Sequence, residues 1–297
     1  MKTLQKIAFG LLFLALASPL FAQKENKKTN PKEETWLWEI SGKGLEKPSY
    51  LFGTIHILCP EDFEISSNLK NKLEASQQLV LEVADAENPA NLMVVLQAMT
   101  MKGKKLKDLY TAEEYAELKQ FFTDSIGLDI SMIESFSPMF ATTALLPAMM
   151  GCIETKSYEA ELTALARQQN KEVKEVETLA QQLSMFDTIP YHIQAQELLR
   201  TTREWTKEKA TFAALVDIYK GQKYSLSQAF MHANMGSMTE YKDVLLDNRN
   251  RAWIAKINAF AAEKPTLFAF GAGHLGGEKG LIELLRKEGY TVKPLKN

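Results

Sequence analysis

The chain has 297 residues, of which 45% are hydrophobic and 24% are charged. This balance is that of a globular protein with a core, and it excludes a disordered or collagen-like chain. The 35 basic and 37 acidic residues give a formal net charge of −2, so the basic excess of nucleic-acid-binding proteins is missing and we expect no nucleic-acid partner. The four histidines and two cysteines are too few for a zinc ribbon or a disulfide scaffold, but they suffice for one small metal or acid–base site.

The N-terminus has the pattern of a secretory signal peptide. Lys2 and Lys6 precede the apolar run Ile7–Ala17, and the small residue Ala22 stands before a polar segment, so we expect cleavage after it. The apolar run is shorter than the roughly 20 residues of a membrane-spanning helix, so we expect a periplasmic or secreted product without a stable membrane anchor. Loss of residues 1–22, which hold both lysines and no acidic residue, changes the formal charge from −2 to −4.

A polar leader and a single domain follow. Residues 23–34 are rich in Lys, Glu and Asn, a composition typical of a disordered segment. Residues 35–297 then alternate between apolar runs and helical patterns, with no tandem repeat. We therefore expect one domain over residues 35–297.

Short apolar runs at the two ends of this domain predict strands. They lie at Trp36–Ser41, Ser49–Thr54, Leu79–Val83, Thr266–Phe270 and Tyr290–Pro294, with a weaker one at Glu172–Glu177. The first two read as a hairpin, and the helical pattern Asn68–Gln78 before the third indicates a parallel strand–helix–strand unit.

Between the two ends, residues 89–262 are mostly helical in pattern. They include two expected continuous helices, Tyr191–Lys220, which holds neither Gly nor Pro, and Met238–Ala262. The predicted fold class is α/β, with a central mixed, largely parallel sheet from the N- and C-terminal parts and a large helical insertion between them.

Two histidines occupy the same local setting. His56 follows an apolar strand in Gly53-Thr54-Ile55-His56, and His274 follows another in Gly271-Ala272-Gly273-His274. Polar groups just beyond the carboxyl ends of parallel strands line the ligand crevice of an open α/β sheet, so the two imidazoles are expected to share one functional site. His192 and His232 lie in helical sequence without such glycines, and we interpret them as structural.

Carboxylates can complete this site. Glu82 interrupts the apolar run Leu79–Val83, and a buried acid needs a partner, a hydrogen bond or a metal ion; an exposed position at the strand end remains the alternative. Glu177 is a weaker candidate. Two imidazoles and one or two carboxylates with an open water position suit Zn²⁺, Mn²⁺ or Co²⁺, and without metal the same groups could act as general base and orienter.

The helical segment before the last strand pair carries Asp247-Asn248-Arg249-Asn250. Arg249 could hold a carboxylate or stabilise an oxyanion, and Asn250 could orient a backbone group or a ligand. A solvated helical face is the simpler interpretation of the same residues. Cys59 and Cys152 stand 93 positions apart, and we take two free buried thiols as the default, with a disulfide left open.

Taken together, these segments resemble the TraB/GumN family, whose animal relatives are the Tiki proteases. The resemblance runs from about Trp36 to Pro294 and rests on Leu51–Leu58, the Glu82 strand, Glu175–Thr178, Asp247–Asn250 and Gly271–Gly277. It implies a fold related to the erythromycin esterase and haem-binding ChaN-like groups, and Tiki members are described as metal-dependent peptidases with paired Gly-x-x-His motifs and an acid.

Carried over residue by residue, the resemblance implies a catalytic site of His56, Glu82 and His274, with Arg249 and Asn250 beside it. Glu159 and Glu177 match positions at which the family tends to have acids, and we count them as additional candidates. Cys59-Pro60 departs from the family, where we expect Pro with a polar neighbour, and we interpret the thiol as a small apolar filler.

The leading hypothesis is an exported metal-dependent hydrolase of the peptidase kind. His56, Glu82 and His274 would bind one divalent ion (Mn, Co or Zn), its water would be the nucleophile, and Arg249 or Asn250 would stabilise the oxyanion. The alternative is a non-catalytic envelope protein that sequesters a peptide or haem in the same crevice. A third hypothesis is a scaffold whose helical block binds another envelope protein.

Overall fold

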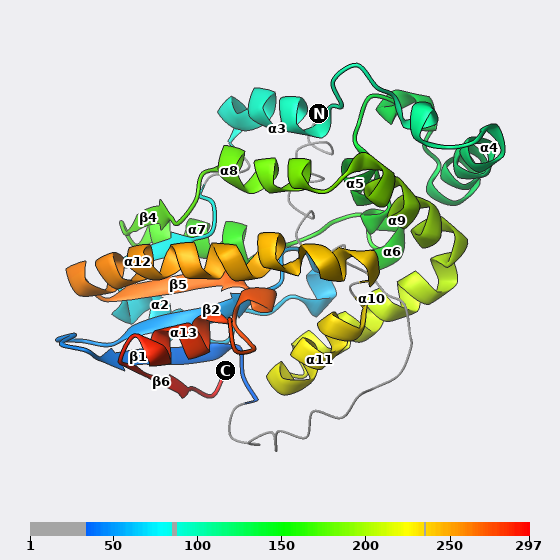
Figure 1. The fold of residues 1–297 in the computed structure, drawn as a ribbon. Helices are drawn as coiled ribbons and strands as arrows, with labels where there is room; N and C mark the ends of the chain where they lie inside the picture. The colour runs from blue at the N-terminus through cyan, green and yellow to red at the C-terminus, as the bar shows by residue number, and fades with distance from the viewer. Residues whose placement is uncertain (1–33, 85–87, 235) are drawn as a thin grey trace.

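The structure, a computed structural model, describes residues 34–84, 88–234 and 236–297. The predicted signal peptide and nearly all of the predicted leader lie outside these described residues. Figure 1 shows a sheet with helices on both of its faces and a block of helices beside one end of it. The molecule is therefore an α/β protein with a helical insertion, which confirms the predicted fold class.

The sheet has six strands in the order β4-β3-β5-β2-β1-β6. Their bounds are Leu37–Gly42 (β1), Ser49–Thr54 (β2), Gln78–Leu81 (β3), Glu172–Glu175 (β4), Thr266–Gly271 (β5) and Tyr290–Pro294 (β6). The pairs β3–β4, β3–β5 and β2–β5 are parallel, whereas β1 pairs antiparallel with both β2 and β6. All six predicted strands are present, and the weak one becomes the edge strand β4, which the middle of the chain contributes.

The central strands are buried on both faces, which explains their nearly unbroken apolar sequences. In β5, Leu267 and Ala269 point to one core and Phe268 and Phe270 to the other, as the two-residue period of a strand requires. Helices α2 (Ser67–Ala75) and α7 (Tyr158–Gln168) cover the first face, and α12 (Asn248–Glu263) and α13 (Leu281–Lys287) cover the second.

The remaining helices form the block, and all but α11 contribute residues to two further cores. They are α3 (Leu92–Met99), α4 (Ala112–Phe121), α5 (Pro138–Thr143), α6 (Leu146–Met150), α8 (Leu179–Ser184), α9 (Tyr191–Arg203), α10 (Trp205–Lys220) and α11 (Tyr224–Asn234). Within the part of the chain that the structure describes, no helix is both long and apolar enough to cross a membrane.

The prediction of one helix over Tyr191–Lys220 is wrong. The chain bends at Glu204 (φ −98°, ψ 23°), which separates α9 from α10. The bend lets Leu198 in α9 reach a core of the helical block while Tyr219 in α10 packs into the sheet core. These two cores lie in different directions, so packing overrides the uninterrupted helical pattern.

The predicted helix Met238–Ala262 is also irregular. A 3-10 turn, Gly236–Tyr241, and a π turn, Asp243–Asp247, precede α12, which begins at Asn248. Arg249 therefore lies in the first turn of a regular helix. The π turn places Leu245 so that its carbonyl accepts a hydrogen bond from Arg249 Nη1.

Cys59 and Cys152 form a disulfide, with their Cα atoms 5.9 Å apart. The default expectation of two free thiols is therefore wrong. The sequence could not reveal this pairing, because 93 residues separate the two cysteines and only the fold brings them together. The bond joins the segment that follows β2 to the loop that precedes α7.

Candidate functional site

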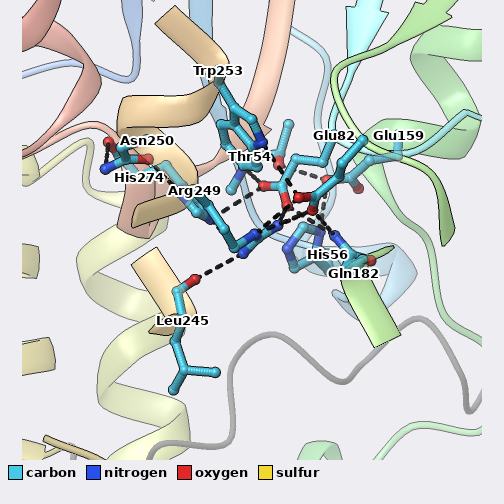
Figure 2. A network of polar contacts seen from close by, with 12 residues as sticks. Thr54, His56, Glu82, Glu159, Gln182, Leu245, Arg249, Asn250, Trp253 and His274 are labelled. Carbon is cyan, nitrogen blue, oxygen red and sulfur yellow. Dashed lines mark hydrogen bonds and ion pairs between the residues drawn. The ribbon is translucent and has the colours of Figure 1, made fainter. Parts of the chain in front are cut away.

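The sheet topology brings four predicted polar residues to one edge. Strands β4, β3, β5 and β2 are neighbours that run in the same direction, so their carboxyl ends lie side by side. His56 follows β2, Glu82 follows β3, Glu177 follows β4, and His274 follows β5. All four side chains are at least nine-tenths buried, and Figure 2 shows His56, Glu82 and His274 near Arg249.

Arg249 is the centre of this network. Its Nε and Nη2 donate to Glu177, its Nη2 also donates to Glu82 Oε2 over 2.6 Å, and its Nη1 donates to the Leu245 carbonyl over 2.9 Å. Nη1 also lies 3.0 Å from His274 Nε2. A guanidinium has five N–H donors, and these contacts engage all of them. In this arrangement Arg249 has no N–H left for an oxyanion, and its role is to position the other groups.

The protonation state of His274 follows from its two neighbours. Because Arg249 can only donate, His274 Nε2 must accept, so Nδ1 carries the proton and donates to Asn250 Oδ1 over 2.6 Å. Asn250 Nδ2 donates to the carbonyls of His274 and Lys279, which fixes the orientation of its amide. Burial, reinforced by the Arg249 charge, lowers the pKa of His274 to about 3, so this imidazole is neutral.

Glu82 is held as a carboxylate. Its Oε1 accepts from the Gly271 N–H over 2.7 Å and lies 3.7 Å from His274 Nε2, and Gln182 Nε2 donates to its Oε2 over 3.1 Å. Burial opposes the charge, but the positive charges of His274, which is itself protonated at the low pH where Glu82 titrates, of Arg249 and of His56 outweigh it. With the Gly271 N–H they lower the pKa of Glu82 to about 2. The predicted exposed alternative for Glu82 is therefore wrong, since only 4% of its surface is exposed.

His56 pairs with a second carboxylate from the first turn of α7. Its Nδ1 lies 2.7 Å from Glu159 Oε1, and the same oxygen accepts from the Thr54 hydroxyl over 2.6 Å. Burial lowers the pKa of His56, but the charge and hydrogen bond of Glu159 and the charge of Glu82 outweigh burial and raise it. Glu159 Oε1 thus orients the ring so that Nε2 is the atom that can exchange a proton.

Gly271 lies close to both Glu82 and His56. A Cβ atom at this position would lie 3.1 Å from Glu82 Oε1 and 3.1 Å from His56 Nε2. Glycine is therefore what allows these two atoms to approach the same point on the backbone. Each of the two histidines thus has a ring nitrogen near the Glu82 carboxylate.

Glu177 forms the outer side of the network. Besides Arg249, it accepts from Gln182 Nε2 over 3.2 Å and from Trp253 Nε1 over 3.3 Å. Burial and the nearby Glu82 charge raise the pKa of Glu177. Two acids that share the donors of Arg249 and Gln182 thus differ in pKa, with Glu82 the stronger acid.

The structure adds participants that the sequence did not single out. Thr54 is fully buried and binds Glu159, and its place between a buried strand and His56 was the available signal. Gln182 in α8 binds two site carboxylates, but a glutamine in a polar helix gives no signal. Of the remaining histidines, His192 lies exposed in α9, away from this sheet edge, and His232 lies in α11.

The donor types suit a divalent cation, although their arrangement commits some of them to Arg249. Of the three buried carboxylates, Glu82 and Glu177 bind the Arg249 guanidinium and Glu159 binds His56. His56 Nε2 and Glu82 Oε1 approach one point, whereas His274 Nε2 accepts from Arg249. Over the described ranges, no group of three or more His, Cys, Asp or Glu side chains has the arrangement of a metal site, so His274 could become a third ligand only if Arg249 moved.

Comparisons with known proteins find one curated relative. A search of curated proteins finds the zebrafish (Danio rerio) protein named metalloprotease TIKI1, which is 20% identical to this chain over 87% of the chain and 63% of the relative. The chain thus spans less than two thirds of that relative's length. No solved structure matches this chain significantly.

A family model provides the broader match. The TraB/PrgY/gumN model matches residues 36–294, a range that includes the whole sheet and every residue of the network around Arg249. The first predicted strand begins at the same residue as this match. The chain belongs to the TraB/PrgY/gumN family.

Proposed function

We propose that this protein is a metal-assisted hydrolase that cleaves peptide bonds. The observation that carries the proposal is the convergence of His56 and His274 on the Glu82 carboxylate at the edge of the sheet. The family and the similarity to a protein named as a metalloprotease support hydrolysis. The assignment of peptides as the substrate class rests on that relative's name alone.

In the absence of a metal ion, His56 is the group that would take the proton from water. Its Nδ1 is engaged by Glu159, so proton transfer takes place at Nε2, on the side of Gly271. A carboxylate beside the far ring nitrogen orients the ring and stabilises the imidazolium that forms. Glu159 would therefore position His56 and balance its charge during the reaction.

A divalent cation would be held by His56 Nε2, in place of that proton, and by Glu82, with His274 as the additional expected ligand. Such an ion lowers the pKa of bound water and polarises the carbonyl of the substrate. Arg249 and Asn250 were expected to stabilise the oxyanion, but their N–H groups are engaged with protein atoms. We therefore assign them the positioning of Glu82, Glu177 and His274.

A second form of the hypothesis needs no metal. The His56–Glu159 pair, with Thr54 bonded to the same carboxylate oxygen, has the order of groups found in a general base and its orienter. Hydrolysis by this pair alone would persist after treatment with a chelator. The expected peptide- or haem-sequestering role uses the same residues and would show saturable binding without products.

We also propose that the protein is exported. Its first residues have the signal pattern described above, and the Cys59–Cys152 disulfide is the kind of bond that persists in oxidising compartments. The mass of the protein recovered from the cell envelope or the culture medium tests this proposal, because cleavage after Ala22 leaves Gln23 as the first residue. A product that retains residues 1–22 would contradict it.

The activity test uses the purified protein and a mixed peptide library, read by mass spectrometry with and without Mn²⁺, Co²⁺ or Zn²⁺. We expect new peptide ends that depend on added metal and vanish in His56→Gln and Glu82→Gln. The matched control is His192→Gln, because His192 lies exposed on α9 and its loss leaves the network intact. No cleavage by wild-type protein under any of these conditions would overturn the proposed function.

A further inference from the structure

The Cys59–Cys152 disulfide ends a row of cross-links between two segments that carry site residues. The segment from Thr54 to Cys59 follows β2, and the segment from Cys152 to Glu159 leads into α7. Thr54 and His56 both bond Glu159, and Leu58 and Lys156 exchange two backbone hydrogen bonds of 2.9 Å. The disulfide closes the row three residues beyond His56.

The loop on one side of this row is otherwise held at its C-terminal end, where Lys156 lies over the Phe63 ring and the Tyr158 hydroxyl donates to the Glu64 carbonyl. Ile153 is 99% exposed, and Glu154 and Lys156 are also exposed, so the loop does not pack its own apolar side chains into a core. Its attachments to the Thr54–Cys59 segment are the disulfide and the Leu58–Lys156 bridge. The loop in turn leads directly into the helical turn that contains Glu159.

Glu159 is a costly group to hold in place. It is buried, with 6% of its surface exposed, and its Oε1 accepts from both Thr54 and His56. A buried carboxylate is retained only while such hydrogen bonds compensate for the water it has lost. A loosened loop gives this carboxylate a way to leave the strand edge and become hydrated.

We propose that the Cys59–Cys152 disulfide is a redox-controlled positioning element that holds Glu159 against His56. A dithiol reductant supplies two electrons and two protons: the S–S bond breaks, two thiols form, and the reductant closes its own disulfide. Cys152 is partly exposed and so accessible to such a reductant. The oxidised protein keeps the His56–Glu159 pair assembled, and the reduced protein releases it.

This inference rests on the proposed function only for its effect on catalysis. The structural effect is measurable without any substrate, by long-range ¹H–¹⁵N NMR of the imidazole nitrogens. In the oxidised protein His56 should show one fixed ring state with a hydrogen-bonded Nδ1. His274 is an internal control, because Asn250 and Arg249 hold it from the other side of the site.

The experiment compares oxidised wild type, wild type reduced with dithiothreitol and alkylated, and Cys59→Ala/Cys152→Ala. We expect the His56 signals to shift and broaden in the last two samples while the His274 signals stay unchanged. Where the peptidase assay gives activity, kcat should fall by about 100-fold, as expected for a misplaced catalytic group, with a smaller change in KM.

A stability control separates positioning from general loosening. Leu285→Ala removes a fully buried side chain from α13, on the opposite face of the sheet, and should lower the unfolding midpoint without changing the His56 signals. Unchanged His56 signals in the reduced protein would overturn the inference. Global unfolding on reduction, seen by near-ultraviolet circular dichroism, would also overturn it, because the bond would then support the whole fold. If oxidised wild type shows no peptidase activity, the NMR result still stands, and the missing activity counts against the proposed function alone.

Discussion

Arg249 Nη1 lies 3.0 Å from His274 Nε2, a contact in which only the arginine can donate. A permanent cation beside an imidazole excludes the imidazolium, so α12 sets the charge state of the histidine that follows β5. The two Gly-x-x-His motifs are consequently unequal. His56 faces a carboxylate that outweighs burial and raises its pKa, whereas burial, reinforced by the guanidinium, lowers the pKa of His274 to about 3.

Removal of the guanidinium should destabilise the fold. Arg249→Met leaves Glu82 and Glu177 buried without their main cation, and breaking a buried ion pair from one side costs about 3–5 kcal/mol. The free energy of unfolding from urea denaturation measures this loss. Arg251→Met is the control on the same helix, because Arg251 is exposed, and we expect a change within about 0.5 kcal/mol. Equal effects of the two variants would contradict the central role of Arg249.

The neutral state of His274 predicts an acid-sensitive stability. Its pKa is about 3 in the folded protein and about 6.5 in an unfolded chain. Between these pH values the unfolded chain binds a proton that the folded protein does not, so this contribution is complete above pH 6.5 and declines as the pH falls. The expected slope is up to about 1.4 kcal/mol per pH unit.

Subtracting the profile of a His274→Gln variant isolates this contribution. Urea denaturation of both proteins between about pH 3 and 8 should give curves that converge as the pH falls, because glutamine does not titrate. The variant is less stable at neutral pH, where the wild-type hydrogen bonds to Asn250 and Arg249 are complete. Parallel curves would contradict the prediction, because they would mean that His274 has the same pKa in the folded and the unfolded protein.

Much of the sheet was predictable from the sequence, because buried strands have continuous apolar runs and the Gly-x-x-His segments mark their carboxyl ends. Their convergence follows from parallel pairing, so His56, Glu82 and His274 could be grouped before the structure was known. The helical part was less predictable. The bend at Glu204 has no Gly or Pro signal, since it results from packing against two separate cores.

The roles of the site residues were harder to predict than which residues belong to the site. The Asp247–Asn250 segment indicated a site cation, but only the contacts show that every N–H of Arg249 is used within the protein. Gln182 and the disulfide partners depend on residues far apart in the sequence, 100 positions for Gln182 and Glu82 and 93 for the cysteines. No periodicity carries information over such distances.

The charge of Glu159 should set the pH profile of the proposed hydrolase. Its charge and hydrogen bond raise the pKa of His56, so Glu159→Gln lowers that pKa. A base is active when it is neutral, and the acidic limb of the kcat/KM profile should therefore move to lower pH. The maximal rate should fall by about 100-fold, the scale of a lost acid–base contribution.

Glu161→Gln is the matched control for this change. Glu161 lies in the same first turn of α7 and pairs with the exposed Lys156 at the surface, so neither the limb nor the rate should change. The profiles are measured with the peptide that wild-type protein cleaves best. A limb that stays in place in Glu159→Gln would show that His56 is not the titrating base.

Metal binding should be visible as a gain in stability and should compete with Arg249. If His56 and Glu82 hold a divalent ion, Mn²⁺ at 100 times its Kd stabilises the folded protein by about 2.7 kcal/mol, which for a chain of this length raises Tm by roughly 5 °C. A chelator should reverse the shift, and Glu82→Gln should abolish it.

Arg249→Met should bind Mn²⁺ more tightly than wild type, because it releases His274 Nε2 and Glu82 Oε2 as ligands and removes a positive charge. Calorimetric titration measures both affinities, and weaker binding by Arg249→Met, in protein shown to be folded, would mean that the guanidinium supports the ion instead of competing with it.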